Sequence, residues 1–549
     1  MYNYMTTPTT SPDLYGGASS PTVTDAPIRP SRWSVPAPLS RLPWPLLGIL
    51  AVQAGLSLRL VWSNTAFSDE ALYIWAGHLE WQHWLHGLNI AHYGFQYYFS
   101  GAPVVYPPLA AVFDSLGGLT AARLLSLVFI AIATALLWST TRRLYDARAA
   151  FYAAALFALI GCAQDLGAFA TYDAMAILCL ALAFWLGIRG VYARSAASSF
   201  ALYTCCALVM GLGDAVKYAT ALWNPVVILA VLATAWRVRG DWRRGVGSAL
   251  FVTAVLGACI GFALREAGRS YVYGIMFTTL DRKVEDIYLA PAIVLWVGFS
   301  YVWVIVFLSV TALIGNLATR RGGHGPELMF SVAMAVAPLL PIIEAAHSHS
   351  AASVYKHVVF GAWFAAVTSG RLLAAATSVH PRKGWRIGAA VLSLAALAGY
   401  GQGTTQYEYW PGTAALVPEL RSVLSTTSGP VLCQELRPVN YYLGPDVDTE
   451  RFTGLTLPIE ASPEDSPLYK QVVTSIRRHY YAVIEINTQQ PPPGAIWTNA
   501  DNEGAEIARV ALVSLVDHTA GYRQVATIPW RDAWYDGDFH IWKYEGGAR

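Results

Sequence analysis

The sequence predicts a polytopic α-helical membrane protein, with about 11 transmembrane helices, that ends in a small α/β domain. Of its 549 residues, 55% are hydrophobic and 13% are charged, whereas a soluble domain carries about 25% charged residues. Long apolar runs follow one another from residue 44 to about residue 403, and the composition then turns polar. The 37 basic and 35 acidic residues nearly balance, which argues against a general nucleic-acid-binding protein.

Residues 1–40 form the first predicted region. They are rich in Ser, Thr and Pro and hold almost no large aliphatic side chains, so we expect a disordered cytoplasmic tail. The first apolar stretch starts near Trp44 and is followed by no small-residue cleavage site. That stretch is therefore predicted to be a membrane anchor and not a signal peptide.

Eleven segments have the apolar character of membrane helices, which need about 20 residues each. Lys and Arg favour the cytoplasmic loops, and one set of alternate loops holds more than twice as many of them as the other set. This bias predicts a plasma-membrane protein with a cytoplasmic N-terminus and, after an odd number of spans, an extracytoplasmic C-terminus. The predicted spans are residues 44–63, 119–139, 149–164, 172–188, 199–213, 218–236, 246–264, 291–314, 327–345, 355–374 and 387–403.

The first outer loop, residues 64–118, contains no Lys or Arg but many aromatic residues. Its segment 69–88 places Leu and Trp at helical spacings with His between them, which suits a helix lying in the headgroup region. Further on, Ser-Gly-Ala-Pro at 100–103 and Tyr-Pro-Pro at 106–108 break regular structure. We therefore expect a turn before another short helix, and a loop that is folded on the membrane surface.

Residues 404–549 are predicted to form an extracytoplasmic α/β domain that follows a membrane module of residues 41–403. About 145 residues suffice for one small domain. The chain has no internal repeat, which argues against an inverted-repeat transporter. The expected strands lie near residues 431–432, 481–484, 523–528 and 539–544, and the expected helices near residues 415–424 and 503–516.

Neither a disulfide framework nor a metal site is predicted. Five of the six cysteines lie in or beside apolar segments, which leaves Cys433 alone in the polar region, and no zinc-type spacing is present. His347 and His349 form a His-x-His pair without supporting ligands. The sequence specifies no cofactor with certainty, and it leaves a divalent cation open.

Two adjacent carboxylates, Asp69 and Glu70, follow the first span and are the leading candidates for chemistry. At the outer membrane surface they would be within reach of a lipid-linked substrate. The alternative is a helix start, because Ser68 can cap a helix that begins at Asp69 and acids in a first turn are favoured by the helix dipole. The pair alone does not decide between the two interpretations.

Other charged residues are predicted at the same face. Arg59 and Arg123 lie in the outer parts of the first two spans, where ionisable groups suggest function but where Arg also snorkels to the headgroups. Asp173 opens the fourth span and could simply cap its helix. Lys217 lies in an outer turn that the positive-inside bias disfavours, so it could bind a lipid phosphate or pair with Asp214.

Further cations follow in later outer loops. Arg265 and Arg269 precede the eighth span, and Lys356 and His357 precede the tenth. Together with the acids of the first loop they suit sugar transfer from a phosphate-linked lipid, in which a carboxylate deprotonates the acceptor hydroxyl and cations stabilise the departing phosphate. The alternative is a membrane transporter or lipid-linked sugar flippase, whose charges would line a path through the membrane.

Four segments, residues 65–73, 100–103, 121–126 and 170–175, are similar to those of a known family. They resemble the GT-C-fold glycosyltransferases of the protein O-mannosyltransferase and lipid A aminoarabinose transferase superfamily, and most of all actinobacterial phospholipid-carrier-dependent glycosyltransferases. The resemblance covers roughly residues 44–403. It implies a polyprenyl-phosphate-linked sugar donor, transfer with inversion, and a glycan, lipid or protein acceptor that the sequence does not identify.

The resemblance also implies roles for single residues, with Asp69 as the general base and Glu70 assisting or orienting it. Related lipid A transferases commonly have Lys-Pro-Pro where this chain has Tyr-Pro-Pro at 106–108, so we expect another cation to contact the carrier phosphate. The expected phosphate ligands are Lys217, Arg123, Arg265 and Arg269, and the expected substrate-positioning residues are Tyr106, Tyr172, Asp173 and Arg59.

Overall fold

The protein is described by a computed structural model, in which the chain from Trp44 onward forms one compact unit. The predicted tail, residues 1–40, lies outside the described residues. These are residues 43–279, 290–318, 325–349, 351, 353–379, 383–455, 466–490, 500–533 and 535–546.

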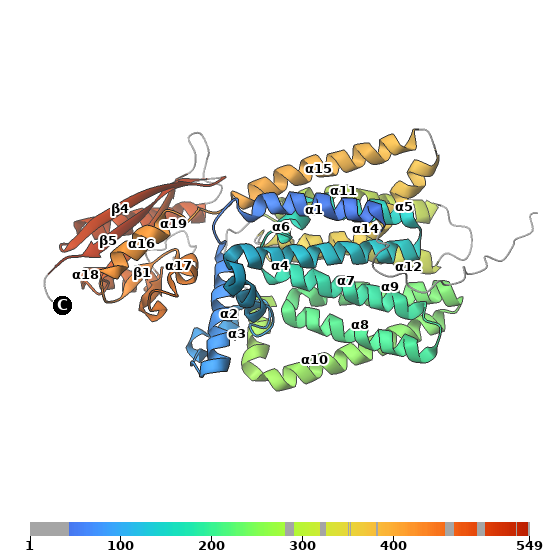
Figure 1. Ribbon diagram of the computed structural model, residues 1–549, viewed down its shortest axis with the longest axis horizontal. Helices are drawn as coiled ribbons and strands as arrows, with labels where there is room; N and C mark the ends of the chain where they lie inside the picture. Colours follow the sequence, from blue (N-terminus) through green and yellow to red (C-terminus); the bar gives the residue numbers. More distant parts are fainter. Residues whose placement is uncertain are drawn as a thin grey trace, which may run out of the picture. The chain divides into compact units, whose positions relative to one another are not determined.

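All eleven predicted spans are helical, and neighbouring helices such as α1, α4, α7 and α8 run alongside one another (Figure 1). Within the described ranges, eight helices are long and apolar enough to cross a membrane, or nine if the pair α12 and α13, bent by 45°, forms one span. The helices are α1 (Trp44–Val61), α4 (Tyr106–Leu144), α5 (Ala147–Leu159), α6 (Gly161–Leu166), α7 (Tyr172–Val191), α8 (Ala196–Val216), η3 (Tyr218–Trp223), α9 (Asn224–Arg239), α10 (Trp242–Thr279), α11 (Pro291–Ala318), α12 (Gly325–Val336), α13 (Leu340–His347), α14 (Val354–Val379) and α15 (Gly384–Tyr407).

The polytopic helical class is confirmed, but the count of about 11 spans is too high by length and composition. Helix α5 has 13 residues and ends at Ile160, whose backbone is extended. At 1.5 Å per residue α5 is about 20 Å long, which is short of a hydrocarbon core of about 30 Å. Helix α15 has 24 residues, but Gln402, Thr404 and Gln406 make its last turns polar. The predicted span 149–164 counted apolar residues across the break at Ile160, and the span 387–403 already ended within the polar last turns of α15.

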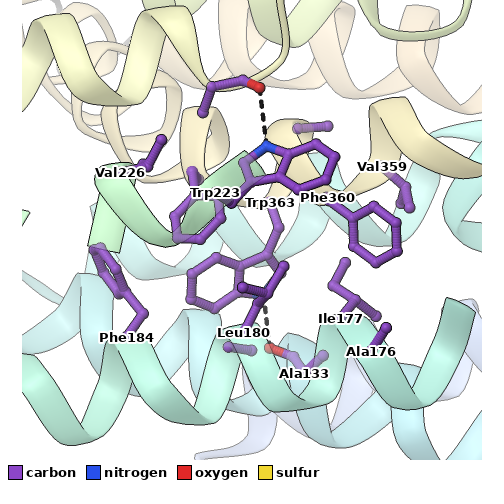
Figure 2. Close-up of a cluster of buried hydrophobic side chains, with 14 of the residues drawn as sticks. Ala133, Ala176, Ile177, Leu180, Phe184, Trp223, Val226, Val359, Phe360 and Trp363 are labelled. Atoms are coloured by element: carbon purple, nitrogen blue, oxygen red, sulfur yellow. Dashed lines mark hydrogen bonds between the residues drawn. The ribbon is translucent and has the colours of Figure 1, made fainter. Parts of the chain in front are cut away.

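An aromatic core holds together helices whose ends carry candidate site residues (Figure 2). Trp223 and Trp363 are almost fully buried, and their indole N–H groups donate to the carbonyls of Ala337 and Ala133 at 3.0 and 2.9 Å. The ring of Phe184, on α7, packs edge-on against Trp363 at 5.5 Å between centroids. Because Trp363 lies on α14 and Ala133 on α4, this cluster fixes α4, α7 and α14 relative to one another.

The first loop is folded, as predicted. Its helix over residues 69–88 is confirmed as α2. The loop elements are α2 (Ser68–His86), η2 (Ala91–Tyr93) and α3 (Phe95–Tyr98).

The helix expected after the Tyr-Pro-Pro motif is the first part of α4, which is interrupted close to the predicted start of the second span. Gly117 and Gly118 have non-helical torsions there, and Gly118 has a φ of 64°, a left-handed conformation that favours glycine. Gly77 of α2 packs on this first part of α4, where an added Cβ would lie 2.0 Å from the carbonyl oxygen of Pro107. The proline motif therefore forms a platform for α2.

The polar C-terminal region forms a five-stranded sheet in the order β2-β1-β3-β5-β4. Strand β1 is parallel to β2 and β3, and β5 is antiparallel to β3 and β4. The four predicted strands and both predicted helices are confirmed, whereas β2, α17 and α18 were not expected. The elements are α16 (Leu416–Ser425), β1 (Val431–Cys433), α17 (Leu436–Leu443), η4 (Thr449–Arg451), β2 (Phe452–Gly454), α18 (Pro467–Arg477), β3 (Val483–Gln490), α19 (Ala500–His518), β4 (Tyr522–Arg531) and β5 (Asp536–Tyr544).

Helices cover both faces of this sheet, because alternate residues of its strands join different clusters. Val431 and Cys433 pack with residues of α16 and α17, whereas Leu432 packs with residues of α18 and α19. Strand β1 thus has a helix layer on each side and a parallel neighbour at each edge, so its carboxyl end is a point where the strand order reverses. Helix α17 starts from this end.

Helix α17 also contacts the first loop. The Tyr442 hydroxyl accepts a hydrogen bond from the backbone N–H of Ala66 at 2.9 Å. The Tyr441 hydroxyl donates to Asp114 Oδ1 at 2.5 Å, and His78 of α2 lies 2.7 Å from the other oxygen of Asp114. These bonds join the sheet domain to α2 and α4.

Candidate active site

The candidate site is built around the first turn of α2, where the two adjacent acids face different surroundings. Phe67 precedes the helix with an extended backbone, and its N–H donates to Glu70 Oε2 at 2.9 Å. The predicted Ser68 cap is wrong, because α2 already begins at Ser68 and Phe67 is the residue before it. The acid Glu70 instead satisfies a free N–H at the helix start. Asp69 takes no part in this cap and is 26% exposed at its side chain.

Glu70 and Arg123 form a closed ion pair beneath this turn, with side chains 0% and 1% exposed. Arg123 donates from Nε and Nη2 to the two carboxylate oxygens at 2.9 and 2.7 Å. Its other N–H groups donate to the carbonyls of Val61, Asn64 and Thr65 at 2.7, 2.9 and 3.0 Å. All five guanidinium donors are thus used to join α1, α2 and α4.

This geometry contradicts both interpretations of Arg123, as a phosphate ligand and as a residue that snorkels to the headgroups. Arg123 has no N–H left for a phosphate, and its burial also excludes snorkelling to the headgroups. Glu70 Oε1 accepts a further bond from the N–H of Ala170 at 2.7 Å, so each of its two oxygens accepts two hydrogen bonds. The pair therefore holds the first turn of α2, which carries Asp69, to the end of α1 and to Ala170 before α7.

Asp69 is the open carboxylate of the pair. Its Oδ2 accepts a hydrogen bond from Lys356 Nζ at 2.7 Å, and its Oδ1 lies 3.8 Å from Arg437 Nη1. Burial raises the pKa of Asp69, but the positive charges of Lys356 and Arg437 outweigh burial and leave its pKa below the ordinary value. Asp69 is therefore ionised at neutral pH and accessible.

A second ion pair, Asp173 with Lys217, lies close to Asp69 and Lys356. Lys217 Nζ donates to Asp173 Oδ1, and Thr171 Oγ1 donates to Asp173 Oδ2 at 3.0 Å. The pairing of Lys217 with Asp214 that the sequence left open is wrong, since Asp214 accepts from Thr220 and Asn224 instead, both at 2.7 Å. Lys217 is 4% exposed, so its charge is committed to Asp173.

The Ser-Gly-Ala-Pro segment at 100–103 sets the position of Lys217. The N–H of Ala102 donates to the carbonyl of Ala215 at 2.8 Å, and the N–H of Tyr218 donates to the carbonyl of Ser100 at 2.8 Å. A Cβ on Gly101 would lie 2.0 Å from the carbonyl oxygen of Val216. Only glycine permits this approach, so the segment holds the chain on both sides of Lys217.

The predicted tyrosines lie beneath these acids. The hydroxyl of Tyr172 donates to that of Tyr73 at 2.6 Å, and the two rings lie 4.2 Å apart. Tyr106 packs edge-on against Tyr172 at 6.0 Å and is 0% exposed. Neither Tyr106 nor Tyr172 is accessible to a substrate, so any effect on positioning passes through packing around Asp173 and α2.

Three predicted cations lie outside the network of Asp69. Arg59 donates to Thr404 Oγ1 at 2.6 Å and to Gln164 Oε1 at 3.1 Å, so it joins α1 to α6 and α15. Arg265 and Arg269 are exposed on α10, and neither forms an ion pair within the described ranges. The predicted convergence therefore holds for Asp69, Asp173 and Lys217 but not for these three.

Two cations at Asp69 come from distant parts of the chain. The sequence indicated Lys356 as a phosphate ligand but not as the partner of Asp69. Arg437 was not expected, because it lies within the polar C-terminal region and belongs to no recognisable motif. As for metals, no group of three or more His, Cys, Asp or Glu side chains in the described ranges is arranged to hold an ion.

Comparisons with known proteins find one family model that matches part of the chain. Residues 102–263 match the family model described as dolichyl-phosphate-mannose-protein mannosyltransferase. A search of curated proteins found no significant match.

Solved structures match most of the chain. ArnT from Cupriavidus metallidurans in the apo state has a TM-score of 0.53 at 15% identity, over 90% of this chain and 97% of that one. The same enzyme bound to undecaprenyl phosphate has a TM-score of 0.53 at 13% identity, over the same shares. The Archaeoglobus fulgidus oligosaccharyltransferase AglB, in complex with an inhibitory peptide and a dolichol-phosphate, has a TM-score of 0.50 at 12% identity, over 80% of this chain and 69% of that one. The chain thus has a GT-C-like fold.

Proposed function

We propose that this protein is a membrane glycosyltransferase that moves a sugar from a polyprenyl-phosphate carrier to an acceptor hydroxyl, with inversion. The observation that carries the proposal is the state of Asp69, a carboxylate that is partly exposed and held ionised by Lys356 on a GT-C-like fold. A general base must be both ionised and accessible. The family match of residues 102–263 supports the nature of the donor.

In the proposed reaction Asp69 accepts the proton of the acceptor hydroxyl as that oxygen attacks the anomeric carbon of the sugar. The bond from the anomeric carbon to the phosphate oxygen breaks, and its electron pair leaves with the polyprenyl phosphate. Negative charge grows on the leaving phosphate, so a nearby cation lowers the barrier. Glu70 and Asp173 act through Arg123 and Lys217, which hold the surrounding helices.

The site would face the outside of the plasma membrane, with the N-terminus in the cytoplasm and the sheet domain outside. The support is the distribution of Lys and Arg among the loops, together with the absence of both from the whole first loop, residues 64–118. We infer a glycan, lipid or protein acceptor. The alternative function, transport or flipping of a lipid-linked sugar, predicts movement of the lipid without a new glycosidic bond.

The decisive experiment compares Asp69→Asn with the wild type in proteoliposomes that contain radiolabelled polyprenyl-phosphate sugars. We expect transfer to fall by about 10²–10⁴-fold, the range for loss of a general base, with an unchanged melting temperature. Asp446→Asn is the matched control, since Asp446 is a half-exposed carboxylate that pairs with Arg421 away from the site. Full activity in a correctly inserted Asp69→Asn variant would refute the base, and lipid movement without transfer would favour the transporter.

A further inference from the structure

The cations closest to Asp69 differ in whether they can still bind a ligand. Arg123 uses all five donors on protein acceptors. Lys217 and Lys356 are 4% and 3% exposed and donate to Asp173 and Asp69. None of these three cations presents an uncommitted charge to a substrate that enters the site.

Arg437 does present an uncommitted charge to the site. Its side chain is 47% exposed, its Nη1 donates to Ser68 Oγ at 3.2 Å, and its ion pair with Asp69 is long at 3.8 Å. No other donor of this guanidinium bonds a residue in the described ranges. A planar guanidinium with free donors matches the oxygens of a phosphate and can bind two of them at once.

The fold holds Arg437 in place, because the turn between β1 and α17 is pinned by a buried acid. Glu485 Oε2 accepts hydrogen bonds from the backbone N–H groups of Gln434 and Glu435 at 2.7 and 3.0 Å. Asn487 Nδ2 in turn donates to Glu435 Oε1 at 3.0 Å. Arg437 follows this turn directly, so a supported helix presents it at the first turn of α2.

We propose that Arg437, supplied by the C-terminal sheet domain, binds the phosphate of the polyprenyl-linked donor beside Asp69. This inference rests on the proposed function and names one of its ligands. Tyr106 is buried and carries no charge, so it does not provide the cation. On entry of the donor, Arg437 exchanges its long contact with Asp69 for the phosphate oxygens, and Asp69 keeps Lys356 as its partner.

The experiment measures binding of undecaprenyl phosphate to the full chain in nanodiscs, with Arg437→Gln, Arg437→Lys and the wild type compared. Loss of a charge-assisted contact is expected to weaken affinity roughly tenfold or more at an unchanged melting temperature, and lysine is expected to restore part of the loss. Arg531→Gln is the matched control, because Arg531 is 75% exposed and pairs with Asp536 in the same domain. It is expected to bind like the wild type.

The outcomes separate this inference from the function on which it rests. If the wild type binds undecaprenyl phosphate and Arg437→Gln binds it equally well, the inference is overturned and the proposed function stands. If the wild type binds no undecaprenyl phosphate and transfers no sugar, the proposed function itself is overturned. The same binding measurement is made with phosphatidylglycerol vesicles and with inorganic phosphate. If Arg437→Gln weakens binding of these anions as much as binding of undecaprenyl phosphate, Arg437 binds any anion, and the carrier is overturned as its ligand.

Discussion

The neighbouring acids Asp69 and Glu70 have opposite environments, although one peptide bond joins them. Glu70 is 0% exposed and is enclosed with Arg123, whose donors all have protein partners. Asp69 is 26% exposed and meets Lys356 from one side and the half-exposed Arg437 from the other. In a helix, successive side chains point about 100° apart, so one first turn can offer one acid to the framework and the other to the substrate.

Two adjacent acids such as Asp69 and Glu70 can therefore differ in role, and only one of them needs to face a substrate. A buried pair with every donor satisfied can be broken only at a high energetic cost, which suits a joint between helices. A pair that keeps one oxygen accessible can exchange partners when a substrate enters. The two kinds of pair should therefore respond differently to mutation.

The largest expected difference is in stability. Arg123→Met leaves the Glu70 carboxylate buried without its partner, which is expected to destabilise the protein by about 3–5 kcal/mol, measured by thermal unfolding in detergent. The double variant Glu70→Leu with Arg123→Met removes both charges and should recover much of that loss.

Lys356→Met is the matched control for the open pair, because Asp69 keeps contact with solvent and with Arg437. We expect a clearly smaller fall in melting temperature than for Arg123→Met. Equal falls in melting temperature for the two variants would mean that both ion pairs stabilise the fold to the same extent. The proposed contrast between Asp69 and Glu70 would then be wrong.

The next effect concerns the pH dependence of transfer. In the wild type the cations hold the pKa of Asp69 below its ordinary value, so the proposed base stays ionised down to low pH. In Lys356→Met the burial of Asp69 dominates, and its pKa is expected to rise. The acid limb of the pH–rate profile should therefore move to higher pH.

A matched profile for Arg531→Met separates this effect from a general change in surface charge. It should overlay that of the wild type. An acid limb that Lys356→Met leaves unmoved would contradict the assignment of Asp69 as the ionised base.

The smallest expected effect extends the comparison to Glu485, a buried acid with no cationic partner among the described residues. Burial, reinforced by Glu435, raises the pKa of Glu485 from 4.5 to about 7. The folded state therefore binds more protons than the unfolded state between these values, and this group makes the protein less stable as pH rises from 4.5 to about 7. Glu485→Gln should melt like the wild type at pH 4 and roughly 2 °C higher at pH 8.

The sign of this difference is the test. A variant that melts lower than the wild type at pH 8 would show that the carboxylate stabilises the turn in its ionised form. Glu485 would then resemble Glu70, a buried acid whose contacts hold the framework together.

Local sequence patterns determined the helical membrane class, the folded first loop and the strands of the last domain. Periodicity and composition are read over neighbouring residues, and each element buries a face that its own sequence specifies. The same patterns placed Asp69 and Glu70 at a helix start and Asp173 at the opening of α7. They failed at Ile160 and at the end of α15, where a break and a polar turn interrupt apolar runs.

Only the tertiary structure decided which charges meet. Asp69 pairs with Lys356 and Arg437, which lie 287 and 368 positions further along the chain, and Lys217 pairs with Asp173 rather than with its close neighbour Asp214. Charge pairing depends on distance in space, and the core that holds α4, α7 and α14 together sets that distance. The sequence therefore determined which residues carry charge at this end of the protein, and packing decided which acid stays open.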